Sequence, residues 1–174
     1  RGPMHGIPLG VKDMIACKEG QTTACSVVFD PDFYGGLDAP VVGRLREAGA
    51  VVMGKTVMPE YCIGLSDPSS PYPTTRYPWD PSKWPGGSSS GSGAGVAAGM
   101  FLGALGTDTG GSVRIPAAFC GVTGLKQTYG LVPKSGCLPY GVTLDIIGPM
   151  TRSAADAAVM LSVMAGYEPS DLSM

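Results

Sequence analysis

The sequence of 174 residues contains little charge and a single histidine. Only 15% of its residues are charged and the net charge is -2, so we expect no broad positive face that would bind nucleic acid directly or attach to an anionic membrane. With one histidine, and five cysteines that form no CxxC pair, it offers no metal-ligand set, and we expect neither metal nor other cofactor. The apolar stretches are broken by glycines and are shorter than the roughly 18 residues of a spanning helix.

The amino end does not resemble a signal peptide, and the odd number of widely spaced cysteines favours a reducing, cytoplasmic setting. What the sequence does contain is glycine and proline, 27 and 16 residues respectively, together with 44% apolar residues. This content indicates a buried core joined by many tight turns.

Strand-like and helix-like segments alternate along the chain, which favours an α/β fold with helices packed on a sheet. Strands are predicted at 7–12, 50–53 and 102–105, and helices at 39–49, from 91 or 92 to 98, 113–119 and 153–165. Asp38, Ser92 and Ser153 are the predicted helix N-caps. The proline-rich segment 66–85 is predicted to be a loop, because proline cannot donate to a sheet or extend a helix.

Two short motifs match enzyme patterns but lack the required context. GAVVMGKT, residues 49–56, has the letters of a phosphate-binding loop, yet its middle residues are strand formers and Pro59 follows soon after. GSSSG, residues 87–91, has the letters of a nucleophile elbow, which needs a histidine later in the chain. The only histidine, His5, comes earlier, so a Ser-His-acid hydrolase is not expected.

GTDTGGSVR, residues 106–114, remains as the strongest candidate site. Its glycines allow several backbone N–H groups to point toward one place beside Ser112, where an oxyanion could be held. One such donor is typically worth roughly 3 to 4 kcal/mol in the transition state. A lysine can serve as the base for such a serine where burial favours its neutral form. The pattern therefore indicates serine chemistry that uses lysine as the base.

The stretch from Pro85 to Pro133 resembles the signature region of the amidase signature family, serine hydrolases that cleave amides. Residues 6–15, 38–56 and 144–161 resemble the flanking blocks of that family in the same order. The resemblance implies a mixed β-sheet core covered by helices on both faces. It also implies that residues 1–174 are one amidase signature domain, a fragment without the N-terminal helices and the C-terminal half.

Carried over to this sequence, the resemblance implies a triad of Ser112 as nucleophile, Ser88 as proton relay after a cis peptide, and Lys12 as base. The implied oxyanion donors are the backbone amides of Thr109, Gly110, Gly111 and Ser112. The implied supporting residues are Ser89, Asp108 and Arg114. The implied substrates are small amides, with aryl esters, anilides or carbamates as further classes, and a homodimer is a possible assembly.

Three positions depart from the usual spelling of the family: Ser90 replaces glycine, and Val57 and Gln127 stand in the GKT and GLK segments. On this ground we favour a free-standing amidase. The first alternative is the glutaminase subunit of a tRNA-dependent amidotransferase, which would need partner subunits. The second is a non-catalytic, glycine-rich fragment in which the serines only cap a helix.

Overall fold

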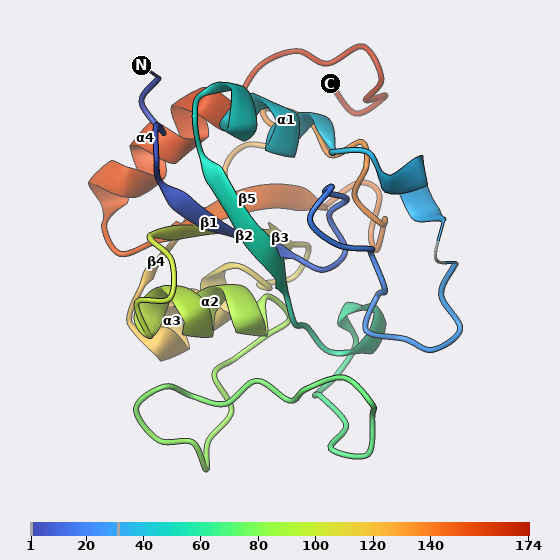
Figure 1. Ribbon diagram of the computed structural model, residues 1–174, viewed down its shortest axis with the longest axis vertical. Helices are drawn as coiled ribbons and strands as arrows, with labels where there is room; N and C mark the ends of the chain where they lie inside the picture. The colour runs from blue at the N-terminus through green and yellow to red at the C-terminus, as the bar shows by residue number, and fades with distance from the viewer. Residues whose placement is uncertain (1, 31) are drawn as a thin grey trace.

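The computed structural model describes residues 2–30 and 32–174, which form a five-stranded sheet between two layers of helices (Figure 1). The strand order is β2-β1-β3-β5-β4. β2, β1 and β3 run parallel, whereas β5 is antiparallel to both β3 and β4, so the sheet is mixed. The strands are β1 (Pro8–Lys12), β2 (Val51–Thr56), β3 (Gly103–Asp108), β4 (Thr123–Gly124) and β5 (Ile146–Thr151).

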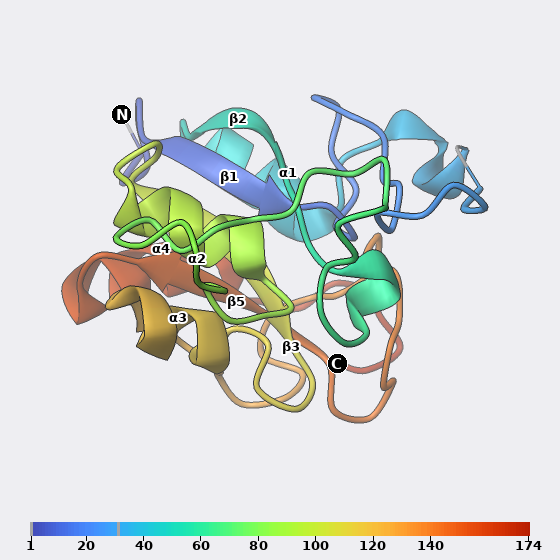
Figure 2. The same cartoon turned by 90° about the horizontal axis from the view of Figure 1, so that it is seen from below.

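Helices cover both faces of this sheet, as predicted (Figures 1 and 2). α1 and α4 contact each other on one face, while α2 and α3 contact each other on the opposite face. The helices are α1 (Pro40–Glu47), α2 (Ser90–Ala97), α3 (Arg114–Cys120) and α4 (Ala154–Met164), with short 3-10 turns η1 (Phe33–Gly36) and η2 (Glu60–Cys62). None of the helices in the described ranges is long and apolar enough to cross a membrane.

The core consists of two apolar clusters, one on each face of the sheet. The larger cluster joins strand residues such as Leu9 and Leu105 to α1 and α4. The smaller cluster lies between the sheet and the helices α2 and α3, and it includes Val96, Phe101 and Met150. Because strand side chains alternate between faces, neighbouring residues of one strand supply both clusters.

Two of the three predicted helix caps need correction. Asp38 does not cap α1, whose N-cap is Ala39; its carboxylate instead accepts hydrogen bonds from the Lys18 amide and the Arg46 guanidinium. Ser92 lies inside α2 and donates to the carbonyl oxygen of Leu105 at 2.8 Å, which ties the helix to β3. The cap at Ser153 is confirmed, because its Oγ accepts from the Asp156 amide at 3.1 Å.

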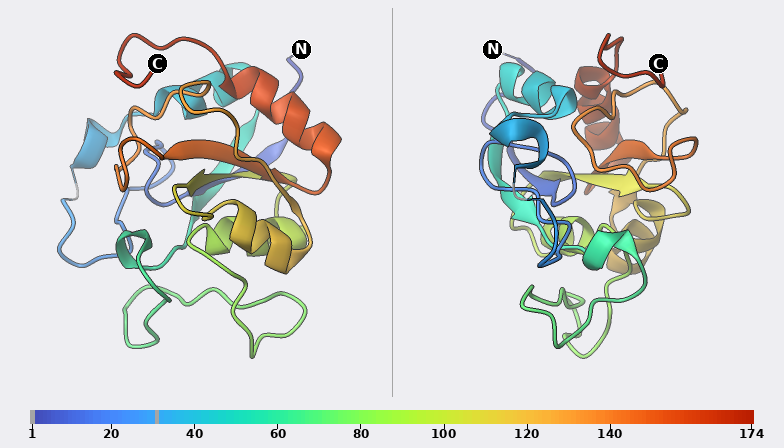
Figure 3. Two further views of the ribbon diagram at one scale, coloured as in Figure 1. Left: turned by 180° about the vertical axis from the view of Figure 1, so that it is seen from behind. Right: turned by 90° about the vertical axis from the view of Figure 1, so that its right-hand side faces the viewer.

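The strand predicted at 50–53 is β2, which extends to Thr56, and it is a partly exposed edge strand where a buried one was expected. Val51 and Met53 are 48% and 60% exposed, while Val52 between them is 8% exposed. From Ile63 to Ser89 the chain has no helix or strand beyond an isolated bridge, and Figure 3 shows this segment, in green, as a long loop below α2 and α3. This loop delivers the serine-rich segment to the start of α2.

Candidate active site

Lys12 is the last residue of β1 and is fully buried at 0% exposure. Its Nζ lies 2.7 Å from Ser88 Oγ and 2.7 Å from Thr107 Oγ1. Burial lowers the pKa of Lys12 below its ordinary value, and the nearby Cys62 thiol opposes this shift. No carboxylate pairs with this amine among the described residues. Lys12 therefore loses its proton more readily than an exposed lysine does.

Ser88 and Ser89 lie where the long loop enters α2. The peptide bond between Gly87 and Ser88 is cis, as the resemblance implies. Ser89 is fully buried, and its Oγ accepts from the Thr107 amide at 3.1 Å and lies 3.2 Å from the Thr107 carbonyl oxygen, to which it donates. The Ser89 amide donates to the carbonyl oxygen of Ser112 at 3.1 Å. These bonds fix the serine-rich loop against both β3 and the glycine loop that follows it.

Ser88 and Ser112 line the same cavity, which has a volume of about 400 Å³. Ser112 is half-buried, and its hydroxyl has no hydrogen-bond partner within the described part of the chain. The structure thus brings Lys12, Ser88 and Ser112 to one place from segments that are up to 100 residues apart in the sequence. Apolar side chains form much of the remaining wall, namely Met14, Ile115, Leu138, Pro139, Val142, Ile146 and Ile147.

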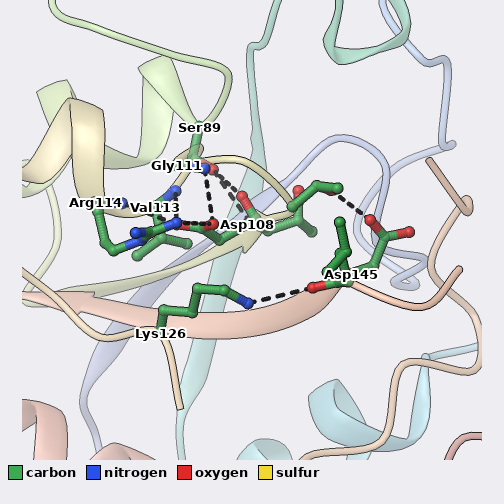
Figure 4. A network of polar contacts seen from close by, with 10 residues as sticks. Ser89, Asp108, Gly111, Val113, Arg114, Lys126 and Asp145 are labelled. Carbon is green, nitrogen blue, oxygen red and sulfur yellow. Dashed lines mark hydrogen bonds and ion pairs between the residues drawn. The ribbon is translucent and has the colours of Figure 1, made fainter. Parts of the chain in front are cut away.

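Asp108 holds the glycine loop from beneath (Figure 4). It is fully buried, and its carboxylate accepts from the amides of Gly111 at 2.9 Å and Val113 at 3.1 Å, and from the Arg114 guanidinium at 2.9 Å. Burial would raise the pKa of Asp108, but the Arg114 side chain and the backbone donors outweigh it, so the pKa lies below its ordinary value. The ionised carboxylate fixes the turn that carries Ser112.

The predicted oxyanion donors divide into two groups. The amides of Thr109, Gly110 and Ser112 have no hydrogen-bond partner among the described residues, and all three residues line the cavity. The Gly111 amide, by contrast, points to Asp108 and not to the cavity. Gly111 has a φ of 139°, which only glycine adopts readily, and this turn orients the loop.

Two residues that contact the site were missed by the sequence analysis. Thr107 is the second partner of Lys12, and Asp145 accepts a hydrogen bond from the Thr109 hydroxyl. The Asp145 carboxylate also accepts from the amides of Tyr140 and Gly141, both at 2.8 to 2.9 Å, and Lys126 holds the adjacent Leu144 carbonyl at 3.2 Å (Figure 4). Nothing in the local sequence of Asp145 indicates that it returns to Thr109, because this contact depends on the pairing of β3 with β5.

Comparison with known proteins identifies the family and the fold. The family model described as Amidase matches residues 1–174. The chain belongs to the amidase family. Among curated members of this family, the A subunit of the glutamyl-tRNA(Gln) amidotransferase from Syntrophobacter fumaroxidans is 49% identical over 169 residues, and that from Exiguobacterium sibiricum is 52% identical over 165 residues. The aligned residues are 97% and 95% of this chain but only 35% and 34% of those relatives.

Solved amidase-family structures have the same fold. The corresponding glutamyl-tRNA(Gln) amidotransferase subunit from Thermotoga maritima has a TM-score of 0.91 at 42% identity, over 100% of this chain and 38% of that one. The peptide amidase of Stenotrophomonas maltophilia has a TM-score of 0.87 at 44% identity, over 98% of this chain and 36% of that one. The chain thus spans about a third of the length of the relatives that it matches.

The comparisons correct one preference of the sequence analysis. The departures at Val57, Ser90 and Gln127 favour a free-standing amidase on sequence grounds, yet the curated relatives at 49% and 52% identity are amidotransferase subunits. In the structure these three residues lie outside the cavity that Ser88 and Ser112 line. Their identities therefore carry little information about the substrate.

Proposed function

We propose that this chain carries the catalytic centre of an amide hydrolase that works through an acyl-enzyme on Ser112. The observation that carries the proposal is the 2.7 Å contact between Lys12 Nζ and Ser88 Oγ at the wall of the cavity that Ser112 also lines. A serine hydroxyl becomes a good nucleophile only when a base takes its proton. A buried, neutral lysine in contact with a second serine supplies such a base.

In the proposed first half-reaction, Ser112 Oγ attacks the carbonyl carbon of the amide. Its proton passes to Ser88 Oγ while the Ser88 proton passes to Lys12 Nζ. The free amides of Thr109, Gly110 and Ser112 hold the developing oxyanion. When the C–N bond breaks, the proton returns from Lys12 through Ser88 to the leaving nitrogen, and an ester remains on Ser112.

In the second half-reaction, water attacks this ester and the same relay takes its proton. The acid is released and Ser112 regains its hydrogen. Asp108 and Ser89 are proposed to hold the loops that carry Ser112 and Ser88 in place. Asp108 accepts from the Gly111 amide, and Ser89 accepts from the Thr107 amide. Arg114 acts through Asp108, because its guanidinium neutralises that buried carboxylate.

For the substrate, we propose the side-chain amide of glutamine, as in the glutaminase component of a tRNA-dependent amidotransferase. The support is the name shared by the relatives at 49% and 52% identity. Such a component would work with partner subunits, and any contact with tRNA would come through them. The charge of -2 is consistent with this indirect role.

A free-standing amidase is the second candidate. The Stenotrophomonas maltophilia peptide amidase is 44% identical, close to the 42% of the solved amidotransferase subunit. The largely apolar cavity wall also suits an apolar acyl group. Glutamine hydrolysis that appears only with partner subunits would favour the first candidate, whereas hydrolysis of aryl or peptide amides by the unpartnered protein would favour the second.

The test of the shared chemistry is labelling with a fluorophosphonate, which reacts with activated serines. We expect the label on Ser112, identified by peptide mass spectrometry, and its loss in Ser112→Ala. Lys12→Ala should slow labelling by about 100-fold to 10,000-fold, the usual contribution of a general base. Ser82→Ala, which changes an exposed loop serine, is the matched control. An unlabelled, folded wild type would leave only the non-catalytic alternative.

A further inference from the structure

Three sulfur atoms meet beside Lys12, and the proposed hydrolysis uses none of them. Cys62 Sγ lies 3.1 Å from Met14 Sδ and 3.3 Å from Met58 Sδ. The three residues come from different segments: Met14 follows β1, Met58 follows β2, and Cys62 ends η2. The Cys62 backbone is left-handed, with a φ of 64°, in the turn that brings its thiol to this point.

The three sulfur atoms of this cluster lie close together. The thiol of Cys62 has one hydrogen, but two thioether sulfurs lie at nearly the same distance from it. Met14 Sδ also accepts a hydrogen bond from Thr107 Oγ1 at 3.1 Å, yet one of the two close sulfur pairs has no hydrogen between its lone pairs. A cation placed among the three atoms would contact all of them at once.

The cluster is also reachable and sheltered. Met14 and Cys62 line the cavity that holds Ser88 and Ser112, so a small ion can reach them from that side. Met58 closes the other side and is 1% exposed. Thiolate and thioether sulfurs are soft ligands that select Cu(I) over hard cations such as Mg²⁺.

We propose that Met14, Met58 and Cys62 form a three-sulfur site for a soft monovalent cation of the Cu(I) class. On binding, the Cys62 S–H bond breaks, its proton leaves to solvent, and three sulfur–metal bonds form without any change of oxidation state. The proposed site differs from one built on histidine or carboxylate ligands. No group of three His, Cys, Asp or Glu side chains lies close enough together in the described ranges to hold a metal ion.

Occupancy of this site should inhibit hydrolysis, a consequence that rests on the proposed function. The bound cation would lie in the wall of the catalytic cavity, close to the amine of Lys12. The Cys62 thiolate neutralises the charge of the cation, so the effect comes from the geometry of the site. Met14 Sδ accepts a hydrogen bond from Thr107 Oγ1, which also contacts Lys12 Nζ, and a metal that takes the Met14 sulfur removes this contact beside the base. The soft metal therefore acts as an inhibitor and not as a cofactor.

The experiment is an anaerobic titration of the Cu(I)–bicinchoninate complex with the reduced protein, in which loss of the coloured complex reports transfer. We expect the wild type to remove one Cu(I) per chain. Cys62→Ser should weaken binding by at least about 100-fold and Met58→Leu by at least about tenfold, since each removes a sulfur ligand and changes of residues that only support ligands already cost about 10-fold to 100-fold. Cys120→Ser, which changes a buried thiol at the end of α3 in the opposite helix layer, is the matched control and should bind as the wild type does.

X-ray absorption of the loaded protein should give a shell of three sulfur atoms in the wild type and two in Met58→Leu. Met58 does not line the cavity, so this variant should retain its fluorophosphonate labelling and resist inhibition by Cu(I). Wild-type affinity in Cys62→Ser, no transfer to the wild type, or no effect of Met58→Leu would each overturn the site. Failure of labelling with intact Cu(I) binding would refute the hydrolase proposal alone.

Discussion

Replacing Lys12 by methionine should change how the stability of the protein depends on pH. Methionine is unbranched and of similar length, so Lys12→Met fills the same space without the amine. In the unfolded chain a lysine has its ordinary pKa of 10.5 and stays protonated up to pH 9. In the fold, burial lowers the pKa of Lys12, so the folded state loses this proton at a lower pH than the unfolded chain does.

The sign and size of the effect follow from this difference. Because the unfolded state binds more protons, the wild type gains stability as the pH rises. One proton corresponds to at most about 1.4 kcal/mol per pH unit, reached above the folded pKa of Lys12. Between pH 6.5 and 8.5 the wild type should therefore gain up to about 2.7 kcal/mol relative to Lys12→Met. The window ends below the ordinary cysteine pKa of 9.0. Above that pH, the raised pKa values of the buried thiols make the protein less stable as the pH rises, which is opposite to the effect of Lys12.

Urea unfolding of both proteins at several pH values measures the difference directly. Lys55, which is also partly buried with a lowered pKa, is present in both and cancels. The rate of fluorophosphonate labelling of the wild type should fall at low pH over the same range, since the protonated amine cannot act as a base. Two unfolding curves that stay parallel from pH 6.5 to 8.5 would show that Lys12 keeps its proton in the fold, and the proposed base would be wrong.

Three further substitutions test the supporting structure. Asp108→Asn should lower the free energy of unfolding by about 2 to 4 kcal/mol, measured by urea unfolding. The buried Asp108 carboxylate accepts several N–H donors, whereas the asparagine amide group is itself a donor. Asp67→Asn, on the surface, is the control and should have little effect. Ser90→Ala should stabilise it or leave it unchanged, since the buried Ser90 Oγ has no partner among the described residues, and a loss of more than about 1 kcal/mol would contradict this. Gly91→Ala should lower the melting temperature, because the new Cβ would lie 2.7 Å from the Val57 amide nitrogen. An unchanged melting curve would show that α2 can shift away from Val57.

The sequence was sufficient for the four helices and for three of the strands, β1, β2 and β3, but it did not predict β4 or β5. Alternation of apolar residues located β1, and its terminal Lys12 was expected to be buried, which the structure confirms. The glycines of residues 106–114 indicated a loop with several free amides, and Asp108 was expected to steady it. These features depend on residues that are close together in the sequence, so a local sequence pattern can predict them.

Other features were decided by tertiary structure, because they depend on strand register and on contacts between distant segments. The order β2-β1-β3-β5-β4 places Thr107 beside Lys12, and the antiparallel pairing of β3 with β5 brings Asp145 to Thr109. The sequence also could not predict that the Gly111 amide donates to Asp108, because this contact forms only in the folded loop. The sequence by itself determined which residue types could perform the reaction, and the fold decided their partners, because hydrogen bonds and burial depend on distances in space and not along the chain.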